Sequence, residues 1–213
     1  MNHLAVLSLH TSPLVQPGSG DSGGMNVYVR ELVSALARSG RESTVFVRRT
    51  DLTTPEVVDV EPGFRVVHVT AGALDLSKEE LPEIVNLFAD HVSKWIRTHG
   101  GFDGLLANYW LSGLAGHRLK HELGLPLTTV FHTLARVKAE TGDIEPQRRM
   151  DAETAVARCS DIILANSEEE SRQLVDLYGT DSSRIEIVPP GVDHSLFSPG
   201  DQDEARKAIG LNG

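Results

Sequence analysis

The chain has 213 residues, of which 40% are hydrophobic and 23% charged, a composition typical of a soluble globular protein with a sizeable core. The net charge is −10 and the basic residues are scattered, which excludes an extended surface for nucleic acid or an anionic membrane. No apolar run is long enough for a signal peptide or a membrane span. The lone Cys159 cannot form an internal disulfide, so we expect a cytoplasmic protein.

Seven short apolar runs rich in β-branched residues have the composition of strands buried on both faces. These predicted strands are residues 4–9, 43–47, 65–69, 104–107, 127–131, 162–165 and 185–188. Helical patterns lie between most of them, at residues 27–38, 81–98, 111–122, 147–158 and 168–178. This alternation predicts an α/β fold built on a doubly wound, Rossmann-like parallel sheet.

Helix ends are also visible in the sequence. Ser77 with Glu80, and Ser167 with Glu170, have the spacing of a capping box, in which side chains satisfy free backbone N–H groups. Glycines that end a helical pattern predict helix termini near Gly40, Gly100 and Gly179.

A glycine-rich loop, residues 18–28 (GSGDSGGMNVY), connects the first predicted strand to the first predicted helix. The helix dipole and free N–H groups at such a junction favour an anion, and glycine allows a phosphate to approach closely. The loop contains Gly-x-Gly-x-x-Gly, but dinucleotide folds place that motif directly after the strand, whereas residues 10–17 intervene here. A plain turn is the alternative interpretation, with Asp21 and Asn26 in turn and N-cap positions.

Polar residues follow the predicted strands at the carboxyl edge of the sheet, where folds of this class bind ligands. His10 follows the first strand and His132 the fifth, and His132 is a candidate sugar hydrogen-bond donor or general acid/base as well as a plain strand-end cap. Lys78, Tyr109, Thr133 and Arg149 together would form a phosphate clamp, although each charge taken singly is typical of a solvated surface.

Two other function classes leave weaker signals. The arginine pair at residues 48–49 ends the second strand, where a phosphorylated dinucleotide would find its basic partner, so an NADP-dependent oxidoreductase stays an alternative. The nine histidines are dispersed, and we predict neither a divalent metal nor a tightly bound cofactor. No Gly-x-Ser-x-Gly nucleophile elbow occurs. We expect Glu153 to be solvated unless it pairs with a neighbouring base.

Several longer motifs occur in order along nearly the whole chain. They are residues 8–13 (SLHTSP), 16–18 (QPG), 21–28 (DSGGMNVY), 76–82 (LSKEELP), 109–113 (YWLSG), 132–138 (HTLARVK), 188–193 (VPPGVD) and 197–199 (FSP). As a set they resemble the N-terminal domain of the GT-B-fold, retaining family 4 glycosyltransferases, especially the D-inositol-3-phosphate glycosyltransferases of mycothiol synthesis. That family often has a His-x-His pair before Tyr-Trp, where this chain has Leu106-Ala107-Asn108.

The resemblance implies a role for each matching position. Gly24 would approach the diphosphate of a nucleotide-sugar donor such as UDP-N-acetylglucosamine, with Gln16 and Pro17 nearby, and His132 would contact the donor sugar near the reacting carbon. Retaining enzymes of this kind need no protein nucleophile, so the protein positions the reactants and stabilises the leaving diphosphate. The implied acceptor-binding residues are His10, Asp21, Ser22, Gly23, Met25, Asn26, Lys78, Tyr109, Thr133 and Arg149.

The resemblance also implies a division of labour between domains. Residues 1–190 would be the acceptor-side domain, and residues 191–213 a linker toward a C-terminal donor-binding domain that this chain lacks. The expected partners are a sugar donor and a phosphorylated acceptor such as inositol 3-phosphate, and the chain alone would be inactive. Transfer to fructose 6-phosphate, as in sucrose-phosphate synthases, and a non-catalytic phospho-sugar-binding module are the alternatives.

Overall fold

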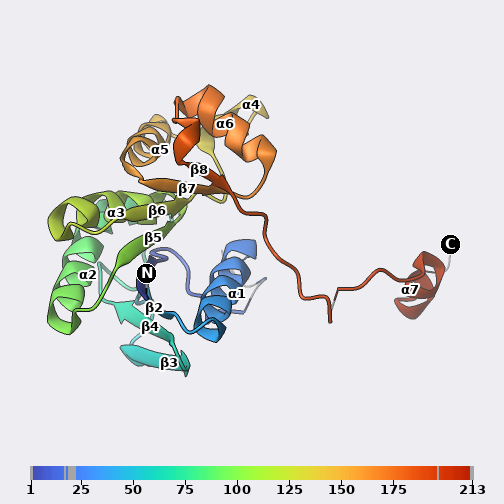
Figure 1. The fold of residues 1–213 in the computed structure, drawn as a ribbon, viewed down its shortest axis with the longest axis horizontal. Helices are drawn as coiled ribbons and strands as arrows, with labels where there is room; N and C mark the ends of the chain where they lie inside the picture. The colour runs from blue at the N-terminus through green and yellow to red at the C-terminus, as the bar shows by residue number, and fades with distance from the viewer. Residues whose placement is uncertain (1, 17, 19–22, 196, 212–213) are drawn as a thin grey trace.

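The computed structural model describes residues 2–16, 18, 23–195 and 197–211 and confirms the predicted α/β fold (Figure 1). Its strands form one sheet in the order β3-β4-β2-β1-β5-β6-β7-β8. The strands are β1 (His3–Leu7), β2 (Glu42–Arg48), β3 (Val57–Glu61), β4 (Phe64–Val69), β5 (Gly104–Asn108), β6 (Leu127–Val130), β7 (Ile162–Ala165) and β8 (Ile185–Ile187). Every neighbouring pair is parallel except β3 with β4.

The helices alternate with the strands, as the sequence pattern predicts. They are α1 (Gly24–Arg38), α2 (Val85–His99), α3 (Tyr109–Leu123), α4 (Ala135–Glu140), α5 (Gln147–Cys159), α6 (Glu168–Tyr178) and α7 (Gln202–Ala208), with 3-10 turns η1 (Leu81–Ile84) and η2 (Ser182–Arg184). The helix predicted from residue 81 begins as the separate turn η1, which contains Pro82, a residue that lacks the N–H needed in a helix interior.

Within residues 1–190, strand β3, helix α4 and the short turn η2 are missing from the sequence prediction. Strand β3 pairs antiparallel at the sheet edge and has no buried residue, so it lacks the continuous apolar run that identifies a buried strand. Helix α4 has six residues, too few for a helical period to be recognised.

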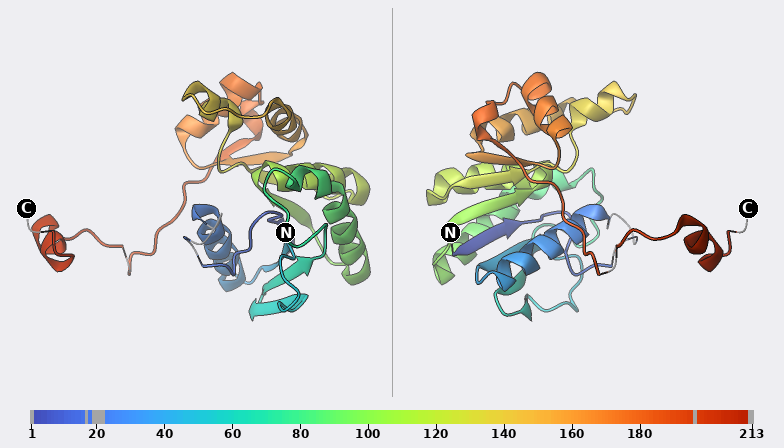
Figure 2. Two further views of the ribbon diagram at one scale, coloured as in Figure 1. Left: turned by 180° about the vertical axis from the view of Figure 1, so that it is seen from behind. Right: turned by 45° about the vertical axis from the view of Figure 1, so that its right-hand side comes forward.

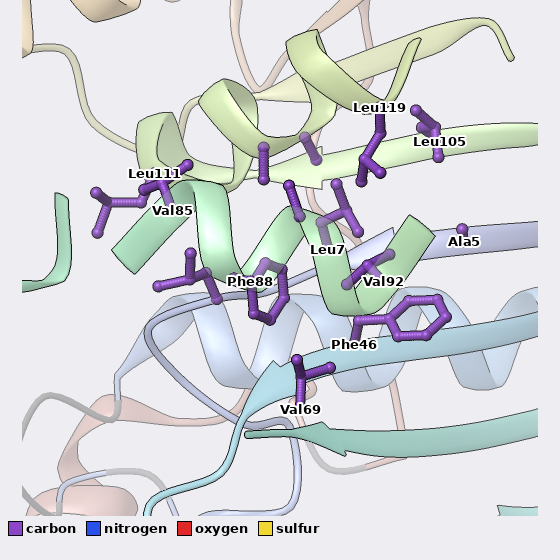
Figure 3. Close-up of a cluster of buried hydrophobic side chains, with 14 of the residues drawn as sticks. Ala5, Leu7, Phe46, Val69, Val85, Phe88, Val92, Leu105, Leu111 and Leu119 are labelled. Carbon is purple, nitrogen blue, oxygen red and sulfur yellow. The ribbon is translucent and has the colours of Figure 1, made fainter. Parts of the chain in front are cut away.

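Helices cover both faces of the sheet. Both faces are apolar because successive side chains of a buried strand point to opposite sides. Val6 of β1 packs with Val29 and Val33 of α1 on one face, and Leu7 belongs to the cluster on the other face. Figure 2 shows α1 on one side of the sheet and α2 with α3 on the other. In Figure 3, Leu7 and Phe46 from the strands lie near Phe88 of α2.

The helix ends confirm the predicted glycine terminations and, with one shift, the cap at Ser167, but the predicted cap at Ser77 is wrong. The Ser77 N–H and hydroxyl donate to the Glu80 carboxylate at 2.9 and 2.8 Å in a turn, and η1 begins after it at Leu81 with no side-chain cap. Gly40, Gly100 and Gly179 follow α1, α2 and α6 with positive φ. The Ser167 side chain accepts from the Glu170 N–H at 3.1 Å, and the Glu170 carboxylate accepts from the Asn166 N–H, one residue earlier than a capping box requires.

Beyond β8 the chain leads away from the sheet toward α7 (Figure 1). Helix α7 has no buried residue and starts at the cap Asp201, whose side chain accepts from the N–H groups of Asp203 and Glu204. Within the described ranges, no helix is both long and apolar enough to cross a membrane.

Candidate functional site

A cavity of about 500 Å³ opens at the carboxyl ends of β1, β5 and β6, the edge at which the sequence predicts a ligand. The structure brings seven of the predicted site residues together around it: His10, Met25, Lys78, Tyr109, His132, Thr133 and Arg149. The remaining lining residues are Glu79, Pro82, Trp110, Leu111, Lys138, Ile144, Glu145, Pro146 and Arg148.

Two lining residues have a left-handed backbone. Tyr109 (φ 74°) begins α3 directly after β5, and His132 (φ 64°) comes two residues after the end of β6. They are the two residues other than glycine with positive φ in the described part of the chain. Such backbone costs about 1–3 kcal/mol for a non-glycine residue and clusters at functional sites, where surrounding structure holds it in place.

Aromatic rings form one wall of the cavity. The rings of His10 and Tyr109 lie 4.6 Å apart between centroids. The guanidinium carbon of Arg149 is 5.1 Å from the centre of the Tyr109 ring, a cation–π distance. Tyr28 of α1 meets the edge of His132 at 5.0 Å. These contacts hold the polar groups of His10, Tyr109, Arg149 and His132 in a fixed arrangement at the end of the sheet.

Arg149 is held by two carboxylates of its own helix and the preceding loop. Its Nε donates to Glu153 at 2.8 Å, and its Nη1 donates to Glu145 at 2.9 Å. Its Nη2 donates to the Thr133 hydroxyl at 3.0 Å and to the Thr133 carbonyl at 3.2 Å. The predicted partners Arg149 and Thr133 therefore touch directly.

The expectation that Glu153 is solvated is wrong, because this residue is fully buried. Besides Arg149, it accepts from the Ala135 N–H at 2.9 Å and from the Tyr178 hydroxyl. The alternative, pairing with a neighbouring base, is the arrangement that the structure has. A buried carboxylate needs such partners because leaving it unpaired costs several kcal/mol.

The rest of the cavity wall carries mixed charge. Lys138 donates to Glu145 at 2.5 Å and lies 3.4 Å from Asp143. Burial opposes ionisation of Glu145, but the hydrogen bond from Lys138 and the charge of Arg149 outweigh it and lower its pKa. Sequence reasoning missed Glu145; nothing marks it except its place four residues before Arg149, the spacing of a helical ion pair.

His132 is neutral at pH 7. Burial, together with the nearby His10, lowers its pKa to about 4. Its Nε2 lies 3.0 Å from Oδ1 of Asn108, an oxygen that can only accept, so Nε2 carries the proton and Nδ1 remains an acceptor. His132 is thus placed as a neutral hydrogen-bonding group.

Several predicted residues lie away from the cavity lining. Asn26 is 2% exposed and uses its side chain inside the preceding loop, with Thr11 and the Ser12 carbonyl as partners at 2.6 and 2.7 Å. Gly23 is the N-cap of α1 and Gly24 its first residue, and Gln16 is exposed in the loop before them. Pro17, Asp21 and Ser22 lie outside the described residues.

The arginine pair behind the oxidoreductase alternative is used inside the fold. Arg48 is 8% exposed and donates to the carbonyls of Ala73 and Leu74 at 2.8 and 3.3 Å. Arg49 donates to the Thr54 carbonyl at 2.6 Å. Both guanidinium groups therefore brace loops after β2 and β4.

The fold is that of a glycosyltransferase family. The chain belongs to Glycosyltransferase Family 4, whose sequence model matches residues 22–196. It is similar to the D-inositol 3-phosphate glycosyltransferases of Actinosynnema mirum (44% identity, 99% of this chain and 52% of the relative) and Xylanimonas cellulosilytica (48%, 92% and 49%). The chain spans about half the length of these curated relatives.

Solved structures agree on the fold. Sucrose-phosphate synthase from Thermosynechococcus elongatus superimposes with a TM-score of 0.88 at 27% identity, covering 99% of this chain and 53% of the synthase. Anabaena HepE in complex with UDP-glucose gives a TM-score of 0.64 at 16% identity, covering 99% and 50%, and this likeness concerns the fold alone. The predicted GT-B fold class is thereby confirmed.

Proposed function

We propose that this chain is the acceptor-side half of a cytoplasmic retaining glycosyltransferase that moves a hexosyl unit from a nucleotide sugar to a phosphorylated polyol. Inositol 3-phosphate is the acceptor that we favour, because the curated relatives at 44 and 48% identity carry that name. UDP-N-acetylglucosamine is the donor that we favour. A second domain, beyond residues 191–213, would supply most of the donor site.

The observation that carries the proposal is the charge around the cavity. Four cations line it, namely Lys78, Lys138, Arg148 and Arg149, against the two carboxylates of Glu79 and Glu145. Four of the six charged lining residues are cations, and cations at the carboxyl edge of a parallel sheet suit a small anionic ligand. Such a ligand would compete for them with Glu145 and with Glu153, Asp143 and Glu83 behind the lining. The volume of about 500 Å³ is within the range of small-molecule sites.

Arg149 would hold the acceptor phosphate in a fixed position. Its guanidinium is already oriented by Glu153, Thr133 and the Tyr109 ring, so little side-chain entropy remains to be lost when the ligand binds. In this proposal the phosphate takes the place of the Glu145 carboxylate on Nη1, and Lys78 adds a charge from the other side.

The start of α1 would approach the donor diphosphate. The helix begins at Gly24, its N-cap Gly23 has no side chain to cap it, and its first turn has no acidic residue. An anion at this end would therefore benefit from the helix dipole and could accept from first-turn N–H groups. A Cβ built on Gly23 or Gly24 would meet no atom of the described residues within 4 Å. This open space supports the close approach of a phosphate to the backbone.

His132 would bind a sugar hydroxyl rather than carry a charge. Its neutral ring presents Nδ1 as an acceptor while Asn108 fixes the ring orientation. In a retaining transfer the donor phosphate itself would take the acceptor proton, and the side chains position the two reactants.

Transfer to fructose 6-phosphate is the second candidate. The observation that favours it is the superposition on sucrose-phosphate synthase, with a TM-score of 0.88. Both acceptors are phosphorylated polyhydroxy compounds, so the same cationic wall would serve either one, and a binding experiment must compare them directly.

Calorimetric titration of this chain with inositol 3-phosphate, fructose 6-phosphate and free inositol tests the proposal. We expect inositol 3-phosphate to bind most tightly and free inositol to bind weakest. Tighter binding of fructose 6-phosphate would favour the second candidate, and equal affinity for free inositol would refute phosphate recognition. Absence of binding by all three would contradict an acceptor site formed in this half alone.

Lys78→Met is the variant that tests the clamp, because Lys78 is exposed whereas removal of Arg149 would leave the buried Glu153 carboxylate without its cation. Loss of one charge-assisted contact should weaken phosphate binding by about 10- to 100-fold and leave affinity for free inositol unchanged. Lys94→Met, at an exposed position of α2, is the matched control. Equal affinity of both variants for inositol 3-phosphate would exclude Lys78 from the site.

A further inference from the structure

Two histidines and the single cysteine meet at the edge of the sheet opposite the cavity. His117 and His121 lie in the second half of α3, and Cys159 is the last residue of α5. One ring nitrogen from each histidine and the Cys159 sulfur all lie within 4.8 Å of one another. Since helices run antiparallel to the strands they follow, these helix ends are remote from Tyr109 and Arg149 at the helix starts.

We predicted no metal site from the sequence, but His117 and His121 stand four residues apart on one helix. Residues with this spacing lie on the same helix face, one turn from each other. Their rings are 5.2 Å apart between centroids. Paired histidines at this spacing are a recurrent way for a helix to hold Zn²⁺.

Neighbouring contacts hold the third group in place. Lys120 of α3 donates to the Cys159 carbonyl at 2.8 Å and to Asp161 at 2.6 Å, so the end of α5 is tied to α3. The Cys159 sulfur lies 3.4 Å from Nε2 of His121. Asp161 also balances the charge of Lys120 beside the cluster.

The position of one His117 nitrogen points to a ligand. Its Nδ1 is buried with no hydrogen-bond partner among the described residues, an arrangement that calls for an explanation in a folded protein.

We propose that His117, His121 and Cys159 form a site for a divalent transition-metal ion, with Zn²⁺ as the best match to two imidazoles and one thiolate. Nitrogen and sulfur ligands of this kind select zinc and its neighbours over magnesium or calcium. Binding deprotonates the Cys159 thiol and releases its proton to solvent, and water completes the tetrahedral set. Small side-chain rotations would bring the three ligand atoms, now within 4.8 Å of one another, to the distances that zinc requires.

Such an ion would join α3 to α5 at the ends remote from the cavity. These two helices carry Tyr109 and Arg149 at their starts, so the metal would stabilise the frame that holds them. The site does not depend on the proposed function, since it shares no residue with the cavity lining.

Metal titration of the reduced 213-residue chain tests the proposal. Co²⁺ serves as the spectroscopic probe, and we expect a thiolate-to-cobalt charge-transfer band that zinc displaces. Cys159→Ser should abolish the band. His121→Ala should weaken zinc binding by more than about tenfold, since even the loss of an outer-sphere partner costs a metal site that much.

His91→Ala is the matched control, because His91 is an exposed histidine of α2 outside the cluster. It should bind zinc as the wild type does, and zinc should raise the melting temperature of both proteins but not that of Cys159→Ser. Wild-type affinity in His121→Ala, or a cobalt spectrum without the charge-transfer band, would overturn the proposal. Circular dichroism establishes that each variant is folded.

Discussion

Replacement of Glu153 by glutamine should destabilise the fold by about 3 kcal/mol. The glutamine oxygen can still accept from the Ala135 N–H and the Tyr178 hydroxyl, but its NH₂ group then faces Nε of Arg149, now 2.8 Å from a carboxylate oxygen. Loss of one hydrogen bond between charged groups costs about 1.5–3 kcal/mol. Breaking a buried ion pair costs about 3–5 kcal/mol, and Glu145 retains part of the compensation for Arg149.

Urea unfolding monitored by circular dichroism measures this cost by linear extrapolation. Glu169→Gln is the matched control, because Glu169 pairs with Arg172 on the exposed side of α6, and such pairs contribute about 0–1 kcal/mol. If Glu153→Gln unfolded within 1 kcal/mol of the control, with an unchanged dependence on urea, the buried network would not have the energetic role that we assign to it.

Three further predictions concern residues at or near the site. His132 has a pKa of about 4 in the folded chain and about 6.5 when unfolded, so between these values the unfolded chain binds the proton more readily. Stability should therefore fall by up to about 3 kcal/mol as pH falls through this window. Unfolding free energies measured at several pH values should depend less steeply on pH in His132→Asn. Gly113→Leu should lower the melting temperature, because even a Cβ would lie 2.8 Å from Val156 of α5; an unchanged value would contradict the tight contact of the two helices. Asn26→Ala removes two buried hydrogen bonds and should cost about 2 kcal/mol in urea unfolding; a loss of less than 0.5 kcal/mol would show that the loop holds without them.

Elements with strong local signals were predictable from the sequence. The strand at residues 162–165 and the helix at residues 168–178 have the bounds that their apolar pattern predicts, because burial on both faces or on one face imposes that pattern directly. Strand β3 was not predicted because its place at the sheet edge leaves none of its residues buried. Its pairing with β4 stabilises it. Such pairing depends on two segments, so the pattern of one segment does not reveal it.

The candidate site likewise has some properties that the sequence predicted and others that it did not. The sequence pointed to Tyr109, His132 and Arg149 because polar residues that follow parallel strands gather at one edge. It did not reveal that Arg149 is already paired with two carboxylates or that burial keeps His132 neutral. Those properties arise from neighbours up to tens of residues away in the chain.

The sequence by itself determined the alternation of strands and helices, the glycines that end helices and the edge at which a ligand would bind, since each follows from local pattern and the direction of the chain. Only the tertiary structure decided which polar groups are buried and which of them touch. It paired Glu153 with Tyr178 and brought Cys159 to His121. Desolvation and electrostatic pairing depend on distances in space, and these exist only after helices distant in sequence have packed on the sheet.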